Sequence, residues 1–455
     1  MALAAWIGFV VCGMLLSTRL PTSLAVALVA GGVVFAAISP VGATAAILSA
    51  IPFVYDAIPI GSFDVSPLEL AIVVGSAGLA LRASGALLHR DLRGFISDTL
   101  RPLPLTLAAA GLALVAVLSL LYVADPRHLD ESLLELRKTI LEPIAALVLI
   151  RWAVRNNGLP LLITALATGG AVAALMGGGQ VVSQSGGVLG DETYRARGPY
   201  PHPNNLALYL ERIVMLLGGI ALMSATARRK ALPIAAVLIV GLALTFSRGA
   251  LLGIAAGGAT LLMFKRPPRG WVYYALGLGG AIAAFAAIAG GRLFATGAEG
   301  ATSSRELLWR SSLRMAADHP ITGVGLDQFL YQYGRRYVDP AGWPERYTSH
   351  PHNLLLDVWL RLGVAGIVAF AVIILVSVQL VQHARLREDL SGAAAAGAIA
   401  ALVAGIAHGL VDNSFFLPDL AVLTWCFLAF VEHDAPKLRE RRAWRPLWLS
   451  RSALT

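Results

Sequence analysis

Long apolar runs separated by short polar loops make up most of the chain. Many of these runs approach or exceed the roughly 20 residues that a helix needs to cross a bilayer. They lack the strict alternation of apolar and polar residues found in the strands of a membrane barrel, and helices satisfy their own backbone hydrogen bonds in hydrocarbon. The pattern predicts spanning helices near residues 4–17, 22–38, 42–55, 67–83, 103–123, 139–154, 159–182, 204–223, 231–246, 249–264, 271–290, 354–381, 392–411 and 416–432.

The predicted fold is an all-α polytopic membrane protein with about 12–14 transmembrane helices. Residues 1–432 form one transmembrane domain, in which 291–353 are a large extracytoplasmic loop carrying short helices, and 433–455 form a basic cytoplasmic tail. The run at 42–55 is short enough to be re-entrant instead of spanning. The first run follows no basic region and has no clear cleavage site, so we interpret it as a membrane segment and not as a signal peptide.

Composition agrees with a lipid-facing surface. Of the 455 residues, 57% are hydrophobic and only 14% are charged, whereas a soluble domain carries about 25% charged residues. Cys12 and Cys426 both lie inside apolar runs, where we expect free thiols that pack as small hydrophobic groups. The net charge of +9 is scattered over short loops, which argues against nucleic-acid binding.

Positive charge gathers at one side of the predicted bundle. Basic residues flank the cytoplasmic ends of spans, and counting spans puts every basic cluster on the same side, with both termini there if the number of spans is even. The loops at 124–138, 183–203 and 291–353 then face outward. The clusters are Arg82/Arg90/Arg93/Arg101, Arg151/Arg155, Arg228/Arg229/Lys230, Lys265/Arg266/Arg269, Arg385/Arg387 and the tail from Lys437 to Arg451.

The outward loop at 291–353 contains arginine without lysine. Six acidic residues nearly balance its arginines, so simple attraction to anionic lipid does not explain them. A planar guanidinium binds phosphate or carboxylate through two aligned hydrogen bonds, although the chain as a whole also prefers Arg to Lys. The arginines are Arg292, Arg305, Arg310, Arg314, Arg335, Arg336 and Arg346.

Two outward segments place arginines beside a span. Residues 195–205, RARGPYPHPNN, lead directly into one, and their Gly and Pro residues indicate a fixed, non-helical path. Asn204 is a candidate cap for the following helix, but capping does not account for two arginines and a histidine. The tight turn at 245–249, TFSRG, holds Arg248 at the outer membrane boundary, where an arginine is costly and is a functional candidate.

Two more segments lie in the large outward loop. Residues 304–310, SRELLWR, have the spacing of an amphipathic helix on the membrane surface, and HPITGVGLDQF follows at 319–329. At the mouth of the next span, His350 and His352 flank a proline. They are candidate zinc ligands, but no third ligand of matching spacing is evident, and a histidine acting as general base is favoured because its ordinary pKa lies near neutrality.

Taken together, these segments resemble the O-antigen ligase and polymerase family of bacterial envelope glycosyltransferases. The resemblance covers roughly residues 195–370, and the first 190 residues resemble the family only as a series of spans. The family signature of His-Asn, nine residues, Gly, two residues and Gly is met in full, as are three shorter elements. The matching residues are His352-Asn353 with Gly363 and Gly366, Arg248 with Leu252, Pro203-Asn204, and His319 to Gly325.

This resemblance implies metal-independent, inverting glycosyl transfer without a cofactor. It places the protein in the bacterial inner (cytoplasmic) membrane as a multi-pass protein surrounded by membrane lipid, with its active site facing the periplasm or cell exterior. The implied donor is a glycan on undecaprenyl diphosphate. The implied acceptor is lipid A-core for a ligase, or another glycan for a polymerase of cell-envelope polysaccharide.

Site residues follow from the same resemblance and from the chemistry. Breaking a sugar–diphosphate bond builds negative charge on the leaving group, which fixed arginines stabilise without a metal. We expect His352 and Arg248 to be catalytic, with further arginines on the diphosphate and a supporting set of polar residues. The diphosphate set is Arg195, Arg197 and Arg305, and the supporting set is His350, Asn353, His202 and Asn204.

Several roles stay open at this level. His350 is an alternative base beside His352, and Asn353 is placed either to orient the imidazole or to cap the next helix. Arg361 would be a phosphate ligand or an interface anchor. If a metal were needed, the first candidate ligands would be Asp191 and Glu192.

Two other classes of protein compete with the enzyme. A transporter or flippase for a lipid-linked glycan should show repeats and polar residues at mid-membrane depth. The ionisable residues instead cluster at the loops, and Glu211, Arg212 and His408 are the nearest exceptions. A structural envelope protein leaves the arginine-rich loop unexplained. Among enzymes, a ligase, a polymerase, a secreted-polysaccharide polymerase and a protein O-glycosyltransferase remain open, as do the sugar and the oligomeric state.

Overall fold

The computed structural model describes residues 1–16, 21–60, 63–88, 103–190, 193–264 and 297–435. Regular structure in these ranges is almost entirely helical, which confirms the predicted all-α polytopic membrane fold. Within the described ranges, six helices are long and apolar enough to cross a membrane, judged by length and composition. They are α4 (Pro67–Leu88), α6 (Leu103–Ser119, continued by the 3-10 turn η2, Leu120–Tyr122), α9 (Leu159–Ser183), α10 (Pro203–Met223), α16 (Leu354–His383) and α17 (Leu390–Gly409).

Shorter helices occupy the other predicted spans. A helix lies at every predicted position except 271–290, which is outside the described residues. Because only six described helices are both long and apolar enough to cross a membrane, the total of about 12–14 spans stays a prediction. The shorter helices are α1 (Ala2–Leu16), α2 (Thr22–Ile38), α3 (Pro40–Ala50) with the turn η1 (Ile51–Phe53), α8 (Glu142–Arg155), α11 (Ala225–Ala243), α12 (Arg248–Phe264) and α18 (Pro418–Asp434).

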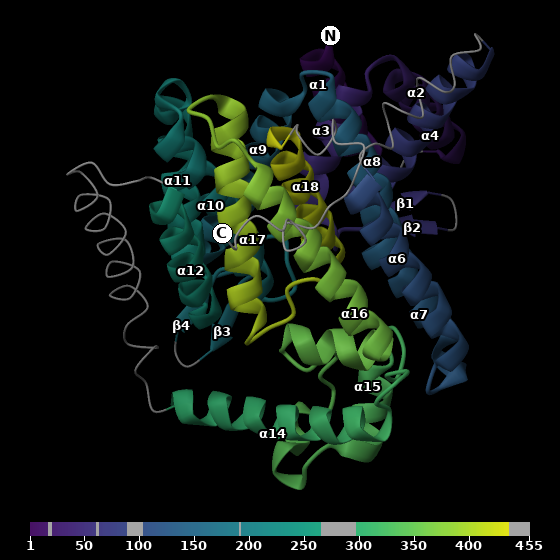
Figure 1. Cartoon of the computed structure of the whole chain (residues 1–455), viewed down its shortest axis with the longest axis vertical. Coiled ribbons are helices and arrows are strands. Elements are labelled where there is room, and N and C mark those ends of the chain that lie inside the picture. The colour runs from purple at the N-terminus through teal and green to yellow at the C-terminus, as the bar shows by residue number, and fades with distance from the viewer. Residues whose placement is uncertain (17–20, 61–62, 89–102, 191–192, 265–296, 436–455) are drawn as a thin grey trace, which may run out of the picture.

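The alternating direction of successive helices gathers the loops at two ends of the bundle (Figure 1). At one end Asn353 Nδ2 donates to Leu410 O at 3.0 Å, and at the other Arg385 N donates to Asp434 O at 3.2 Å. The first end also carries α14 (Gly297–Asp318), and we call it the α14 end. The described parts of the loops predicted to share a side lie there, together with two turns. These are residues 124–138, 183–190, 193–203, 245–248, 297–353 and 410–417.

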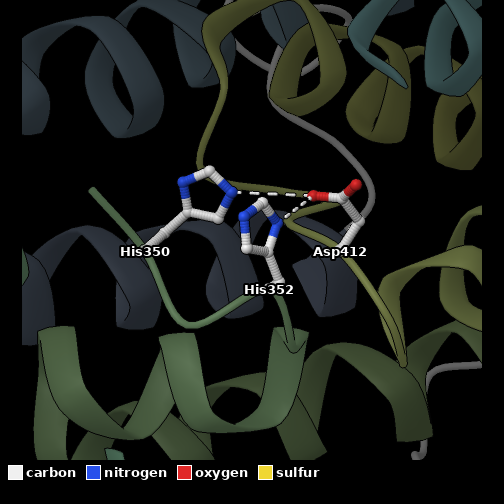
Figure 2. Close-up of side chains that lie close together, drawn as sticks. All are labelled: His350, His352 and Asp412. Atoms are coloured by element: carbon white, nitrogen blue, oxygen red, sulfur yellow. Dashed lines mark hydrogen bonds and ion pairs between the residues drawn. The ribbon is translucent and has the colours of Figure 1, made fainter. Parts of the chain in front are cut away.

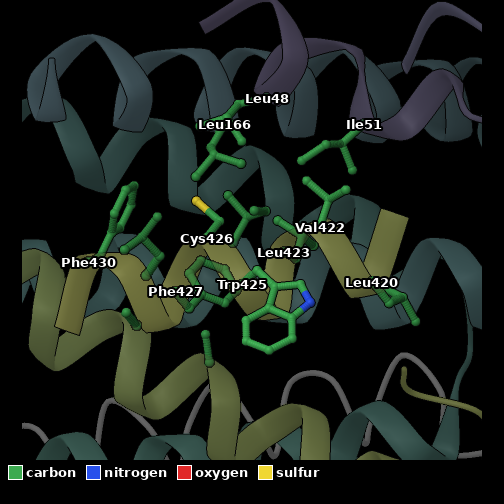
Figure 3. Packing of buried hydrophobic residues seen from close by; sticks show 14 of the residues in the cluster. Leu48, Ile51, Leu166, Leu420, Val422, Leu423, Trp425, Cys426, Phe427 and Phe430 are labelled. Carbon is green, nitrogen blue, oxygen red and sulfur yellow. The ribbon is translucent and has the colours of Figure 1, made fainter. Parts of the chain in front are cut away.

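The largest apolar core surrounds α18 (Figure 3). Trp425 is 1% exposed, and Leu48 from α3 and Leu166 from α9 are fully buried in the same cluster. Cys426 lies fully buried among them, and Cys12 lies in α1. Both cysteines are free, as the sequence predicts.

Short helices and the β3–β4 hairpin lie at the α14 end, and α14 itself lies across it (Figure 1). Leu308 and Met315 of α14 are 3% and 0% exposed, whereas the Arg310 side chain is 67% exposed. The predicted amphipathic helix is therefore confirmed as part of a longer one. The other described elements are α7 (Leu129–Glu135), α15 (Phe329–Gln332), the 3-10 turns η3 (Pro126–His128) and η6 (Pro340–Glu345), the π-turns η4 (Leu136–Leu141) and η5 (Tyr333–Tyr337), and the hairpins β1–β2 (Ile58–Ile60, Phe63–Val65) and β3–β4 (Val188–Gly190, Thr193–Arg195).

A break in α16 joins two of the sequence motifs. The backbone of Gly363 has a φ of 64°, in the left-handed region that glycine adopts without cost, and it interrupts the helix. Leu360 O accepts a hydrogen bond from Val324 N at 2.6 Å, so the glycine turn at 319–325 docks against the break. The two motifs are thus one structural unit, which fixes how the loop before α16 meets the bundle.

Candidate functional site

One buried carboxylate, that of Asp412, gathers the polar side chains at the α14 end. It lies in the turn between α17 and α18 and is 5% exposed. Its Oδ1 lies 2.8 Å from His352 Nδ1 and 3.6 Å from His350 Nε2 (Figure 2). Its Oδ2 accepts a hydrogen bond from Asn204 Nδ2 at 3.0 Å and lies 3.9 Å from Arg305 Nη2. We call these five residues the Asp412 cluster.

The turn that carries Asp412 is fixed by local hydrogen bonds. Asn413 N donates to Asp412 Oδ1 at 2.9 Å, and Asn413 Oδ1 accepts from the backbone N–H groups of Phe415 and Phe416 at 3.2 and 3.0 Å. Asparagine favours such turns because its short side chain bonds the backbone just after it. The direction of the carboxylate is therefore set by the turn.

The histidine segment is held from two sides. Trp309 Nε1 on α14 donates to Pro351 O at 3.0 Å, and Asn353 Oδ1 caps α16 by accepting two backbone N–H bonds, both at 3.1 Å. Capping is thus the role that the structure gives Asn353. His352 itself has a φ of 49°, a left-handed conformation that costs a non-glycine residue about 1–3 kcal/mol and that clusters at functional sites.

Arg195 joins the cluster to the turn before α12. Its Nη2 donates to Asn204 Oδ1 at 3.1 Å, and its Nε donates to Thr245 O at 2.8 Å. The prediction that Asn204 caps α10 is wrong, because His202 is the N-cap and its Nδ1 accepts from Asn204 N at 3.1 Å. With the cap supplied by the histidine, the Asn204 amide bridges Arg195 and Asp412.

Arg248 begins α12 and is exposed. The turn before it contains Phe246 with a φ of 51°, another left-handed non-glycine residue at this end. Thr245 in the same turn accepts the bond from Arg195, so the turn is tied to the Asp412 cluster. The guanidinium of Arg248 makes no ion pair with the residues that the structure describes, so it is available to a ligand.

Other predicted residues have local partners. Arg197 donates from Nε to Gly186 O at 2.5 Å and from Nη1 to Tyr200 O at 3.1 Å, so these donors hold the 183–203 loop together. Arg361 is 3% exposed and pairs with Asp357 and Glu135 inside the fold, so it is neither an exposed phosphate ligand nor an interface anchor. Asp191 and Glu192 lie outside the described residues.

Charge within the cluster is unbalanced. Burial alone would raise the pKa of Asp412, but hydrogen bonds from His350 and His352, together with their charges, hold it well below its usual range. Burial lowers the pKa of His350, and burial followed by the charge of Arg195 lowers the pKa of His202. The ionised Asp412 carboxylate thus lies beside Arg305 and is joined to Arg195 through Asn204, and two arginines near one carboxylate favour an anionic ligand.

The same end of the bundle contains a possible set of metal ligands. His350, His352 and Asp412 each offer one ligand atom, and these atoms lie within 4.8 Å of one another. The sequence shows no third ligand near the two histidines, and the structure supplies one from 60 residues away. Three protein ligands with an open position are typical of catalytic zinc, so metal dependence needs direct measurement.

The sequence prediction omits Asp412, although the signal for it is present. The acid lies between the predicted spans at 392–411 and 416–432, on the side that carries the outward loops. An ionisable residue at a membrane boundary is a functional candidate on its own. The sequence lacks only the information that this turn meets His352.

The site can now be compared with known proteins. A family model described as O-antigen ligase matches residues 233–371, somewhat under a third of the chain. The match includes Arg248, Arg305 and the segment from His350 to the Gly363 break, whereas Asp412 lies outside it. No curated protein matches the chain. The match confirms the resemblance to the O-antigen ligase and polymerase family over this central region.

Proposed function

We propose that this protein transfers a glycan from undecaprenyl diphosphate to a lipid A-core or glycan acceptor, as an O-antigen ligase or a surface-polysaccharide polymerase. The reaction takes place at the outer face of the inner membrane, inverts the anomeric centre and needs no metal. One observation carries the proposal: the hydrogen bond between Asp412 and His352, with arginines from three separate segments at the same end of the bundle.

The α14 end faces the periplasm or cell exterior in this proposal. Arg151 and Arg385 lie at the opposite end, where they contact Glu432 and Asp434 of α18. Basic residues concentrate on the cytoplasmic side of membrane proteins, so their position supports this orientation.

His352 is the general base, and His350 is its neighbour. The Nδ1 of His352 contacts Asp412, so its Nε2 is left for an acceptor hydroxyl, and the side chain is 30% exposed. His350 directs Nε2 toward Asp412 and Nδ1 toward Ser349 Oγ at 3.0 Å, and its side chain is 19% exposed. A carboxylate on Nδ1 holds a histidine in one tautomer and stabilises the imidazolium that forms.

The transfer is a single displacement. The acceptor hydroxyl oxygen attacks the anomeric carbon from the face opposite the diphosphate, and its proton passes to Nε2 of His352. The bond between the anomeric carbon and the diphosphate oxygen breaks, and its electron pair leaves with the diphosphate. Attack from the opposite face inverts the configuration, and general-base assistance of this kind contributes about 100–10,000-fold in rate.

Three arginines supply the positive charge that the leaving diphosphate requires. Arg195 is held by Asn204 and the Thr245 carbonyl, so its position is set before the donor binds. Arg305 is one-third exposed and Arg248 is exposed, so both are open to a ligand. Removing one preorganised donor of this kind typically costs roughly 100–1000-fold in rate.

The proposal is tested by glycan transfer with the purified full-length protein in detergent. Undecaprenyl-diphosphate glycan is the donor, and lipid A-core or a second lipid-linked glycan is the acceptor, with EDTA in one series and added Zn²⁺ in another. His352→Ala and Arg248→Ala are run beside the wild type, with thermal unfolding as the check on folding. We expect transfer that survives EDTA and is lost in both variants, and the mobility of the product then separates ligation from polymerisation.

Other outcomes point elsewhere. Transfer abolished by EDTA and restored by Zn²⁺ would make the two histidines and Asp412 a metal site. Transfer that persists in both variants would show that the proposed active site is wrong. Absence of transfer with every acceptor would favour a flippase for the lipid-linked glycan.

A further inference from the structure

A second carboxylate–histidine pair lies inside the bundle, between α10, α12 and α17. His408 Nδ1 lies 2.9 Å from Glu211 Oε2, and the two side chains are 1% and 0% exposed. His408 precedes Asp412 by about one helical turn, and Glu211 follows Asn204 by roughly two turns. The pair therefore lies directly inward of the Asp412 cluster along both helices.

Glycines make room for these polar groups. A methyl group on Gly253 would lie 2.6 Å from Glu211 Oε2, and one on Gly405 would lie 2.7 Å from Arg212 Nε. Any side chain on Gly249 would collide with the imidazole of His408. Two neighbouring helices are thus shaped around Glu211, Arg212 and His408, which the sequence marks as the nearest exceptions to the clustering of ionisable residues at loops.

The pair contacts the segment that presents Arg248. The imidazole of His408 lies against Gly249, the residue directly after Arg248 in the first turn of α12. A shift of His408 would therefore move the backbone that carries Arg248.

Arg212 supports the other half of the site. Its Nη2 donates to Ser414 O at 2.6 Å and its Nη1 to Leu420 O at 3.4 Å, and the residue is 3% exposed. Ser414 lies two residues after Asp412 in the turn between α17 and α18. Adjacent residues of α10 thus contact both halves of the site, Glu211 through His408 and Arg212 directly.

Stability alone does not account for these buried groups. Replacing a buried ion pair by apolar residues of similar volume is often neutral or stabilising. In addition, Glu211 Oε1 is buried without a hydrogen-bond partner among the described residues, and an unsatisfied buried oxygen destabilises the folded state. Ionisable residues inside a membrane protein are costly and are functional candidates for that reason.

We infer that Glu211 and His408 are positioning residues for Arg248, and that Arg212 is a positioning residue for Asp412. Together they set the separation between the arginine that meets the donor diphosphate and the carboxylate that holds the histidine base. This inference rests on the proposed function, because it assigns Arg248 to the diphosphate and Asp412 to His352.

A double-mutant cycle tests the inference on the full-length protein. His408→Gln is measured alone and together with Arg248→Lys, which keeps the charge but loses the planar fork and leaves activity to measure. We expect His408→Gln alone to lower kcat and raise the donor KM, by about 10–100-fold in kcat/KM, with the acceptor KM unchanged. With Arg248→Lys already present, the same change should cost less than about 2-fold, because the two residues act through one contact.

The control and a gentler variant keep the test decisive. Glu432→Gln breaks a buried ion pair at the opposite end of the bundle, so any effect it has should be equal in both backgrounds. Glu211→Gln is the alternative if His408→Gln does not fold, because glutamine has nearly the same shape as the native glutamate. It should give a smaller loss in kcat/KM, with the same non-additivity toward Arg248→Lys. Equal losses in both backgrounds, or wild-type activity of folded His408→Gln beside an inactive Arg248→Ala, would overturn the inference alone. Full activity of Arg248→Ala would overturn the proposed function and this inference together.

Discussion

Two buried carboxylates at opposite ends of the bundle have very different neighbours. At the end away from α14, Glu432 accepts two hydrogen bonds from Arg151, at 2.5 and 2.8 Å, and the side chains are 7% and 2% exposed. At the α14 end, Asp412 meets two histidines, one amide and one arginine, and the His352 and Arg305 side chains stay about one-third exposed.

The difference separates a structural pair from a functional cluster. The Arg151–Glu432 pair is neutral, closed and bidentate, so it has nothing left to offer a ligand. The Asp412 cluster combines one carboxylate with one arginine and two histidines, and the partly exposed side chains of His352 and Arg305 are accessible to a ligand.

The largest contrast is expected between Asp412→Asn and Glu432→Gln. The first should lower the transfer rate roughly 1,000–10,000-fold while the protein stays folded, because an amide no longer fixes the tautomer of His352. The second should leave the rate within a few-fold but lower the free energy of unfolding by about 3–5 kcal/mol, because it leaves Arg151 buried without its carboxylate. Transfer rates and thermal unfolding measured on both variants check this, and similar rates in the two variants would contradict it.

The next contrast lies between two arginines of the α14 end. Arg305→Ala should lower kcat about 100–1000-fold, because Arg305 lies beside Asp412 and is open to the diphosphate. Arg197→Ala should cost much less in kcat, since its described donors contact the carbonyls of Gly186 and Tyr200. Steady-state kinetics with a saturating donor would compare kcat of the two variants. A larger loss of kcat in Arg197→Ala than in Arg305→Ala would indicate that Arg197 binds the diphosphate.

The polar residues of the α14 end show what the sequence can and cannot predict. Hydropathy locates the spans because burial in lipid acts on local runs of residues, and the motif positions of Arg248, Arg305 and His352 are local too. The partner of Asp412 is not local: it lies across α17 and the whole of α16, 60 residues away. The arginines at 195 and 197 are equivalent in sequence, and only the path of the β3–β4 hairpin directs one to Asn204 and the other to its own loop.

A smaller effect is expected where α16 is interrupted. Gly363→Ala places a side chain at a φ of 64° and against the carbonyl of Ile321, so it should lower the free energy of unfolding by at least about 1–3 kcal/mol. It should also lower transfer, because the docked 319–325 turn positions the loop that enters α16. Gly178→Ala in α9 is the control, since nothing lies within 4 Å of the added carbon. Equal unfolding temperatures for the two variants would show that the break in α16 does not require a glycine at position 363.

The smallest effect is the dependence of stability on pH. Burial lowers the native pKa of His350 below its ordinary value near 6.5, so the unfolded chain binds a proton that the folded chain does not. Stability should therefore fall as the pH drops below about 6.5 and continue to fall toward the native pKa. Asp412, whose pKa is depressed, contributes stability throughout this range and loses it only at much lower pH. Thermal unfolding between pH 7.5 and 5 should show a flatter profile for His350→Gln than for the wild type, and identical profiles would exclude His350 as the source.

The central claim is that His352, held by Asp412, removes the proton from the acceptor. The most direct measurement is the single-turnover rate of glycan transfer by His352→Ala, with and without added imidazole, in the presence of EDTA. The account predicts a loss of about 100–10,000-fold that imidazole partly restores, because a free base can enter the space left by the side chain. A variant that transfers at the wild-type rate would contradict the claim, and so would a loss that imidazole leaves unchanged while Zn²⁺ accelerates the wild type.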